Sequence, residues 1–318
     1  MKLVVQIPCL NEEQTLPMVL KDIPKKIPGI DKIIVLVIDD GSTDKTVEVA
    51  REQGVQHFVH HAYKQGLARS FHDGLIKSLE LGADIIVNTD GDNQYPGKSI
   101  ADLVTPIVNG KADIVIADRQ VRAIAHFSPF KKFMQRLGTK VLNLAAGTNV
   151  PDAPSGFRAY SKEAATRLHV VTQFSYAMET IIQAGNKRLH IESIPIITNP
   201  KTRESRLFNS SWEHIFKSGS AILRSFIMYR PYAFFVTLGL ILFFLGLVPF
   251  VRFLLLITIG GEEGTRHIQS LLAGSILIIG SFLTLALGVV ADLIRINRTL
   301  IEQNLELEKR KLSQGASE

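Results

Sequence analysis

The sequence has a single cysteine and a single tryptophan in 318 residues, and what it lacks excludes several classes of protein. Because Cys9 has no second cysteine to pair with, a disulfide-stapled fold is excluded. No Gly-x-x-x-x-Gly-Lys-Ser/Thr sequence occurs, so a P-loop is excluded. No Gly-x-Gly-x-x-Gly follows the first apolar run, which argues against a dinucleotide-binding fold. With 46% hydrophobic and 21% charged residues, the chain is not a disordered one.

The net charge of +6 is compatible with three kinds of anionic partner: nucleic acid, an anionic membrane surface or a phosphorylated substrate. Charge alone does not choose among them. The motifs described below favour a membrane and a phosphorylated substrate, and we expect no nucleic-acid partner.

The apolar residues gather in two long runs near the C-terminus. Residues 231–251 and 268–291 carry no formal charge, and each is long enough to cross a bilayer, which takes about 20 apolar residues. The short link between the runs predicts a hairpin, so both outer flanks lie on one side of the membrane. Basic residues mark these flanks: Lys217, Arg224, Arg230, Arg295 and Arg298. The positive-inside rule therefore predicts a multi-pass membrane protein whose N-terminal part is cytoplasmic.

These patterns divide the chain into six parts. We predict a cytoplasmic catalytic domain over residues 1–207, amphipathic juxtamembrane helices over 208–230, a transmembrane helix over 231–259, an outer loop over 260–267, a second transmembrane helix over 268–294 and a charged cytoplasmic tail over 295–318. For the tail we favour a solvated helix over pairing with another subunit. Small residues in the second span are compatible with helix association and a homo-oligomer. These are Gly274, Ser275, Gly280, Ser281 and Gly288.

The N-terminal part alternates between strand and helix patterns. Strands are predicted over residues 3–7, 33–38, 55–59, 84–88 and 112–117, with helices over 12–21, 44–53, 66–81 and 98–109 between them. This alternation predicts an α/β fold with a doubly wound, mainly parallel sheet. Ligands of such sheets bind at the carboxyl ends of the strands.

Acidic clusters follow three of these strands. They are Pro8-Cys9-Leu10-Asn11-Glu12, Asp39-Asp40-Gly41-Ser42-Thr43-Asp44 and Asp90-Gly91-Asp92-Asn93-Gln94. Each alone is an ordinary turn or helix cap, but the topology brings all three to one sheet edge. Carboxylates approach a diphosphate only with a cation between them, so Asp90 and Asp92 are predicted to share Mg²⁺ or Mn²⁺ at a nucleotide-diphosphate site. Asp40 could accept a hydrogen bond from a base N–H.

The ordered segments IPCLNEE, VIDDGSTDKT, NTDGDNQYP and SGFRAYS resemble glycosyltransferase family 2. The resemblance spans residues 3–207 and is closest to the polyprenyl-phosphate branch, which includes the dolichol-phosphate mannose and glucose synthases. It implies a GT-A fold and inverting transfer of one sugar from a UDP- or GDP-sugar to a membrane polyprenyl phosphate. The sugar, the base and the prenyl length stay open.

The resemblance also implies roles for individual residues. Pro8, Leu10, Asn11, Glu12, Asp40, Asp90 and Gly91 would bind the nucleotide, and Asp90, Asp92 and Gln94 the metal. Arg119, Arg203 and Arg206 would meet the acceptor phosphate, and Asp92, Arg119 and Asp152 would be catalytic. Because a phosphate monoester is already anionic at neutral pH, no general base is required. Asp152 is expected to touch sugar hydroxyls or to hold an arginine.

A further stretch, residues 129–146, mixes apolar and basic residues as an interfacial helix on anionic lipid does, although an ordinary helix packed on the sheet has the same pattern. Two other functions are compatible with such a fold but not with the motifs present. A processive polysaccharide synthase would carry Gln-x-x-Arg-Trp, which is absent around Trp212. A non-catalytic membrane protein that binds nucleotide sugars would not need the complete Asp90, Asp92 and Gln94 set.

Overall fold

The computed structural model describes residues 1–120, 129–171, 176–200, 226–260 and 268–315, together with residues 220, 223 and 224. The chain divides into two compact units: Met1–Leu223 with Glu302–Glu318, and Arg224–Ile301. Most of the predicted juxtamembrane segment and residues 261–267 of the predicted outer loop lie outside the described residues.

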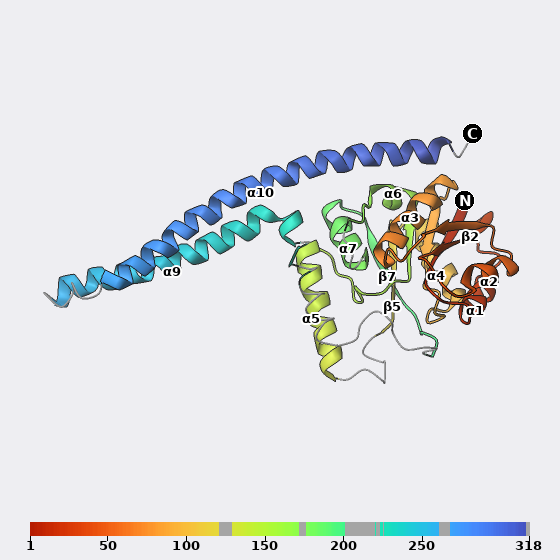
Figure 1. The fold of residues 1–318 in the computed structure, drawn as a ribbon, viewed down its shortest axis with the longest axis horizontal. Helices are drawn as coiled ribbons and strands as arrows, with labels where there is room; N and C mark the ends of the chain where they lie inside the picture. Colours follow the sequence, from red (N-terminus) through yellow and green to blue (C-terminus); the bar gives the residue numbers. More distant parts are fainter. Residues whose placement is uncertain are drawn as a thin grey trace. The chain divides into compact units, whose positions relative to one another are not determined.

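Helices and strands alternate through the first unit (Figure 1). In chain order they are β1 (Lys2–Cys9), α1 (Leu16–Asp22), β2 (Lys32–Asp39), α2 (Thr46–Glu52), β3 (His57–His60), α3 (Leu67–Glu80), β4 (Ile85–Asn88), the 3₁₀ turn η1 (Gly97–Ser99), α4 (Ile100–Val108), β5 (Ile114–Asp118), α5 (Pro129–Ala146), β6 (Arg158–Ser161), α6 (Lys162–Arg167), α7 (Tyr176–Asn186) and β7 (Ile191–Pro195). Two long helices follow among the described residues: α9 (Pro231–Gly260) and α10 (Ile268–Gly315).

The strands form one seven-stranded sheet in the order β3-β2-β1-β4-β6-β5-β7. All neighbouring pairs are parallel except those of β6, which runs antiparallel to both β4 and β5. The predicted α/β fold with a mainly parallel, doubly wound sheet is confirmed. The five predicted strands are all present, whereas β6 and β7 were not predicted.

The core forms because apolar residues alternate across the strands and repeat along the helices. In β1 every residue after Lys2 is buried, as expected for a strand between β2 and β4. Helices α1, α2 and α4 cover one face of the sheet, with Leu16, Ala50 and Leu103 in that core. Helix α3 lies on the other face and buries Phe71 and Leu75 against β1 and β2. Because helices cover both faces of the sheet, a ligand can bind only at the ends of the strands.

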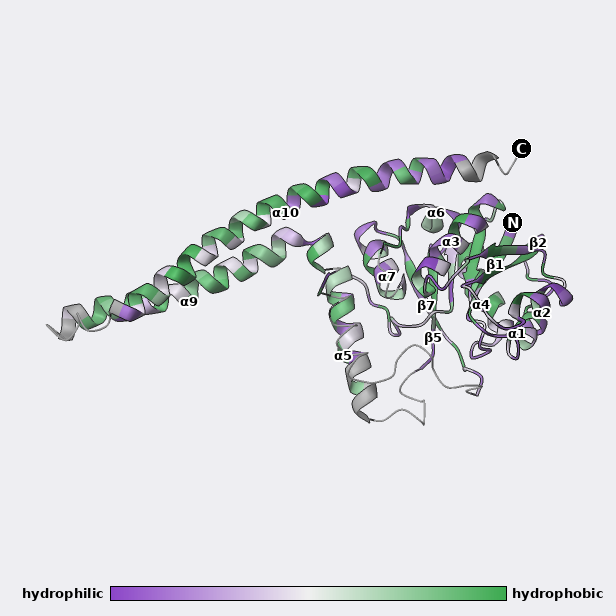
Figure 2. Cartoon of the chain, viewed as in Figure 1, coloured by the Kyte–Doolittle hydropathy of each residue, from purple (hydrophilic) through white to green (hydrophobic). Residues whose placement is uncertain are grey.

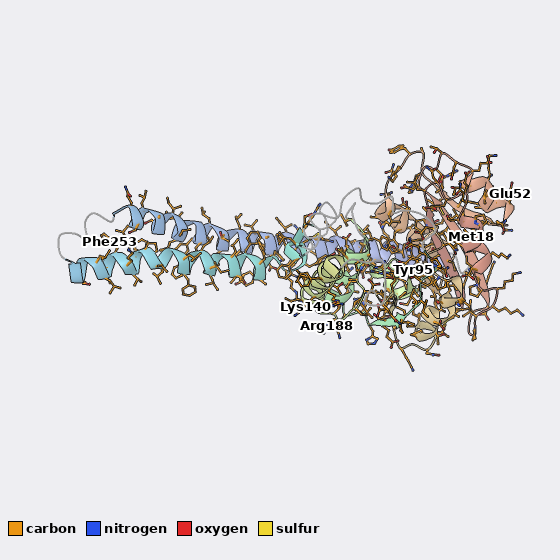
Figure 3. All side chains as sticks on the ribbon, turned by 90° about the horizontal axis from the view of Figure 1, so that it is seen from below. Met18, Glu52, Tyr95, Lys140, Arg188 and Phe253 are labelled. Carbon is orange, nitrogen blue, oxygen red and sulfur yellow. The ribbon has the colours of Figure 1, made fainter. Side chains whose placement is uncertain are left out.

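The second unit is an apolar helical hairpin. Helix α9 begins at Pro231 and α10 at Ile268, and Figures 1 and 3 show the two side by side over their apolar parts. They approach closely at glycines: a Cβ on Gly274 would lie 2.9 Å from the carbonyl oxygen of Gly246. Small residues at such crossings let helix backbones pack together.

Large apolar side chains point away from this hairpin. Phe244, Leu254 and Leu272 are each more than 60% exposed, and Figure 2 shows mostly apolar residues along both helices here. Both helices are long and apolar enough to cross a membrane. A helix that is apolar on every side needs protein or lipid around it.

The last part of α10 belongs to the sheet unit instead of the hairpin unit. It is more polar than the preceding part (Figure 2). Glu302 is 8% exposed and Lys309 is 6% exposed. The expectation of a solvated tail helix is therefore wrong for this face, because side chains of the sheet unit cover it. The sequence did not reveal these partners, which lie more than 100 residues away along the chain.

Candidate active site

The loop after β1 is tied to the loop after β2. Asn11 has a φ of 56°, and its backbone N–H donates to Ser42 Oγ at 3.0 Å. Its side-chain oxygen accepts from the backbone N–H of Thr43 at 2.8 Å. The backbone N–H of Glu12 donates to Thr46 Oγ1 at 2.8 Å. These bonds hold two of the predicted nucleotide-binding residues, Asn11 and Glu12, at the carboxyl end of β2.

The same loop also contacts the turn after β4. The Thr15 hydroxyl lies 2.7 Å from the carbonyl oxygen of Gly91 and 2.8 Å from a carboxylate oxygen of Glu12. A Cβ on Gly91 would lie 3.2 Å from both Glu12 Cγ and Cys9 Sγ, so a larger residue here would have to displace these side chains by a few tenths of an ångström. Pro8 lies buried within β1, and Leu10 lies partly buried just beyond its end.

The environment of Cys9 shows that the three acidic loops converge. Burial raises the pKa of this thiol well above its ordinary value, and the carboxylates of Glu12, Asp39, Asp90 and Asp44 raise it further. Those four groups come from all three loops, so the predicted gathering at one sheet edge is borne out. An anionic substrate could enter such a field only with cations beside it.

Asp40 is buried and accepts several hydrogen bonds. The backbone N–H groups of Gln65 and Gly66 donate to its two oxygens at 2.8 and 2.9 Å. The imidazole of His61 lies 2.9 Å from the Asp40 carboxylate and 3.1 Å from that of Asp73. The carboxylate thus fixes the loop before α3. The pairing of His61 with two carboxylates was not predicted, because Asp73 lies on a helix 12 residues further along the chain.

The Asp-Gly-Asp turn after β4 has a defined shape. Asp92 Oδ1 accepts the backbone N–H of Gln94 at 3.1 Å, and Asn93 has a φ of 59°, a left-handed conformation that asparagine tolerates. Asn199 braces the turn by donating to the backbone oxygens of Asn93 and Gln94 at 3.0 and 2.9 Å. Asp90, Asp92 and Gln94 are all partly exposed, so a ligand can reach them.

This donor set fits a divalent ion shared with a substrate. Among the described residues, no group of three or more His, Cys, Asp or Glu side chains could hold a metal by itself. Asp90, Asp92 and Gln94 offer two carboxylates and an amide oxygen, all hard ligands. Mg²⁺ and similar ions are commonly bound by one or two carboxylates plus substrate phosphates. The predicted residues therefore suit an ion that arrives with a diphosphate.

The loop before β6 reaches this acidic turn. A Cβ on Gly156 would lie 3.0 Å from the Tyr176 hydroxyl and 3.3 Å from Asp90 Oδ2. The backbone N–H of Gly156 donates to the Tyr95 hydroxyl at 3.2 Å, and Figure 3 shows Tyr95 among the side chains of the sheet unit. Asn88, the last residue of β4, donates to the Gly156 carbonyl and to the Tyr176 hydroxyl at 3.0 and 2.9 Å. The two loops are thus packed against each other.

Arg119 and Asp152 form a buried ion pair beside that contact. Asp152 is 1% exposed, and its carboxylate accepts from the Arg119 backbone N–H, Nε and Nη2 at 3.1, 2.7 and 2.9 Å. Burial alone would lower the pKa of Arg119, but Tyr95, Asp152 and Asp90 together raise it above its ordinary value. The guanidinium therefore stays charged and lies within electrostatic reach of Asp90.

Arg158, within the SGFRAYS segment, has a structural role. It is fully buried and donates to the backbone oxygens of Ala153, Ser155 and Ala177 and to Thr180 Oγ1 at 2.6 to 2.9 Å. It binds the loop before β6 to helix α7. Neither this role nor that of Tyr176 was predicted, because a buried arginine has no signature in a single sequence. Arg203 and Arg206 lie outside the described residues.

Comparison with known proteins gives this geometry a family context. The family model described as Glycosyl transferase family 2 matches residues 4–168. A UDP-N-acetylglucosamine–dolichyl-phosphate N-acetylglucosaminyltransferase of Methanococcus voltae is 30% identical over 214 residues, which cover 60% of this chain and 83% of that protein. An undecaprenyl-phosphate mannosyltransferase of Micrococcus luteus is 27% identical over 206 residues, covering 62% and 83%.

A solved structure with the same fold is that of glucosyl-3-phosphoglycerate synthase from Mycobacterium tuberculosis in complex with Mn²⁺, UDP and phosphoglyceric acid. The TM-score is 0.55 at 20% identity, over 71% of this chain and 77% of that one. At this identity the likeness concerns the fold alone.

Proposed function

The chain belongs to glycosyl transferase family 2, and from that premise we propose that it transfers a single sugar, with inversion, from a nucleoside-diphosphate sugar to a membrane polyprenyl phosphate. One observation carries the proposal most strongly: the charge of Asp90 acts on Arg119, which is paired with Asp152, so the acidic turn and the Arg119–Asp152 pair lie within electrostatic reach of each other. An anion-binding group and a cation-binding group side by side suit two phosphorylated reactants. Both named relatives act on prenyl phosphates.

On the donor side, Asp90, Asp92 and Gln94 would hold Mg²⁺ or Mn²⁺ on the diphosphate. The bound ion would neutralise the charge that develops on the departing nucleoside diphosphate. Asn11 and Glu12 would line the nucleotide together with Pro8 and Leu10. Asp40 Oδ2 has a single hydrogen bond, from Gly66, among the described contacts, so it retains room to accept from a base N–H.

On the acceptor side, Arg119 would orient the phosphate monoester of the lipid. Three of its N–H groups are committed to Asp152, which leaves the remaining guanidinium N–H groups to bind phosphate oxygens. The acceptor oxygen is anionic at neutral pH, so it attacks the anomeric carbon without a base. In this scheme Asp152 positions Arg119 and takes no proton. Arg203 and Arg206 are proposed to complete the acceptor phosphate site.

The apolar hairpin supports a membrane-bound acceptor. A prenyl phosphate keeps its phosphate at headgroup level, so the enzyme must work at the bilayer surface. We propose that α9 and residues 268–294 of α10 span the membrane, with the catalytic domain cytoplasmic. Helix α5 has no acidic residue and exposes basic and apolar side chains, as a helix on anionic lipid would. They include Phe133, Arg136, Leu137, Lys140, Val141 and Leu144.

The test uses the full chain in detergent with undecaprenyl or dolichyl phosphate. A panel of UDP- and GDP-sugars is compared with Mg²⁺, with Mn²⁺ and with a chelator. Polyprenol without its phosphate serves as the matched acceptor control. The expected product is polyprenyl phosphate carrying one sugar, formed only with a divalent ion and only from the phosphorylated lipid. A polymer would indicate a processive synthase instead, and donor binding without transfer would indicate a non-catalytic protein.

A further inference from the structure

Charged side chains of the C-terminal helix are buried against the sheet unit. We call residues 302–311 the tail segment. Lys187, just after α7, has its Nζ 3.1 Å from a Glu302 oxygen and 2.8 Å from a Glu306 oxygen. Lys309 donates to the carbonyl oxygen of Leu168 at 2.6 Å. Buried charges of this kind are tolerated only where partners meet them, so these contacts fix one register of the tail segment.

The contact extends to two more elements. Arg310 binds both carboxylate oxygens of Glu163 in α6 at 2.8 Å. The pKa of His72 in α3 is lowered by burial and then by the charge of Lys309, so this lysine also faces α3. Burial lowers the pKa of Lys309 most and Lys187 lowers it too, while Glu306 and Glu302 act in the opposite direction, and the net pKa is about 8. The tail segment therefore contacts α6, α3 and the end of α7.

Helix α7 is hydrogen-bonded to residues 169–171, which directly follow Leu168, the residue that Lys309 of the tail segment contacts. Gln183 accepts the backbone N–H of His169 at 2.9 Å and donates to the same residue's carbonyl oxygen. Glu179 accepts the backbone N–H of Val171 at 3.1 Å. Both side chains are buried. A displacement of residues 168–171 would therefore be passed to α7.

The first turns of α7 pack against residues of the candidate active site. The Tyr176 ring stacks on Phe71 with centroids 4.0 Å apart, and its hydroxyl meets Asn88 and Gly156. Arg158 binds Ala177 and Thr180 of the same helix. Helix α7 thus links residues 168–171, which the tail segment contacts, to the loop at Gly156, which packs on the acidic turn.

We propose that the docked tail segment positions α7 against the loop that contacts the acidic turn, and that its release lowers turnover more than it weakens nucleotide binding. This inference rests on the proposed function. The tail segment continues α10, whose first part is the proposed second span. A segment joined to the membrane anchor would then support the catalytic domain from the side that carries α7. Asn11, Glu12 and Asp40 lie on the loops after β1 and β2, for which the described residues show no contact with α7, whereas Asp90 and Gly91 lie on the turn that the α7-bound loop at Gly156 meets.

The experiment compares Glu306→Lys with Glu308→Lys in the full chain. Glu306 faces Lys187, whereas Glu308 is exposed two residues further along the same helix. Both variants replace a glutamate with a lysine, so they have the same net charge and differ only in which contact is lost. Amide exchange is measured over α7 and the tail segment, together with kcat and KM for donor and acceptor. Lys187→Glu combined with Glu306→Lys tests rescue by charge exchange.

We expect Glu306→Lys to speed exchange over α7 by about tenfold or more, because the docked state is lost locally. The kcat should fall about fivefold or more while the donor KM changes less than about twofold, since displaced positioning groups affect turnover. Glu308→Lys should match the wild type, and the exchanged pair should recover much of the kcat.

Two results would overturn the proposal. One is faster exchange with an unchanged kcat, which would make the tail segment a tether only. The other is an α7 whose exchange is the same in Glu306→Lys as in the wild type. If the wild type transfers no sugar to any prenyl phosphate, the proposed function fails, and the exchange data still decide whether the tail segment holds α7.

Discussion

The ion pair of Arg119 and Asp152 gives the sharpest single perturbation, which is Asp152→Asn. The asparagine keeps the shape of the side chain but removes its charge and points an N–H₂ group at a guanidinium. Removing one partner of a buried pair costs about 3–5 kcal/mol of unfolding free energy. Because the Arg119 side chain is 20% exposed, water replaces part of the lost contact. We therefore expect a loss of about 2–3 kcal/mol.

The same variant distinguishes two roles for Asp152. If it positions Arg119, a misdirected guanidinium should lower kcat/KM by about 10- to 100-fold, with the shape of the pH profile unchanged. If it were a general base, its removal would abolish the acidic limb of that profile. The assay is transfer from a labelled donor to polyprenyl phosphate between about pH 4 and 9, a range that includes the titration of an ordinary aspartate, with thermal unfolding measured in parallel.

The matched control is Asp113→Asn. That carboxylate accepts the backbone N–H of His190 at 2.9 Å, at the start of β5 and thus at the opposite end of this strand from Arg119. It should leave kcat/KM unchanged. The positioning role is refuted if Asp152→Asn keeps full activity and stability, or if the pH profile loses its acidic limb.

Three more predictions follow from contacts within the sheet unit. Gly156→Ala should weaken divalent-ion activation several-fold, because its Cβ would lie 3.0 Å from a hydroxyl and 3.3 Å from a carboxylate oxygen, while Gly138→Ala, with open space around it, should not. Tyr176→Phe keeps its ring stacking but loses buried hydrogen bonds, and should cost about 1–2 kcal/mol of unfolding free energy in a thermal melt. Tyr160→Phe, in the same core, is the comparison. An equal loss in both variants would contradict the role of the Tyr176 hydroxyl in holding Asn88 and Gly156. Folding lowers the pKa of Lys309 from 10.5 to about 8, so between these two values the unfolded chain binds more protons than the folded one. The free energy of unfolding should therefore rise with pH by roughly 1 kcal/mol per pH unit between about pH 8 and pH 10. Denaturant unfolding of wild type against Lys309→Met measures this, and identical pH slopes would contradict it.

Much of the fold followed from local pattern. The β-branched runs of β1 and β2 and the polar residues after them predicted a parallel sheet with acidic loops at one edge. Strand β6 could not be predicted in this way, because its four residues begin with an arginine and carry no alternation. It pairs antiparallel with β4, with Arg158 opposite Asn88, and this register places Gly156 at the end of β4.

The site was predictable where chemistry is written in short motifs and unpredictable where it depends on distant packing. Asp90, Asp92 and Gln94 are three positions of one turn, so their sequence spacing predicts their proximity. Tyr176 contacts Asn88 from 88 residues away, and Lys309 meets Leu168 from 141 residues away. Such pairs arise from the tertiary fold, and a single sequence holds no local signal of them.

The most direct measurement of the central claim is the affinity of the donor's nucleoside diphosphate with Mn²⁺ and with a chelator, for wild type, Asp92→Asn and the exposed control Asp102→Asn. If a cation held by the acidic turn binds the diphosphate, Mn²⁺ should tighten binding by about tenfold or more in the wild type and the control, and hardly at all in Asp92→Asn. Equal affinity with and without the ion, or full ion dependence in Asp92→Asn, would contradict the account.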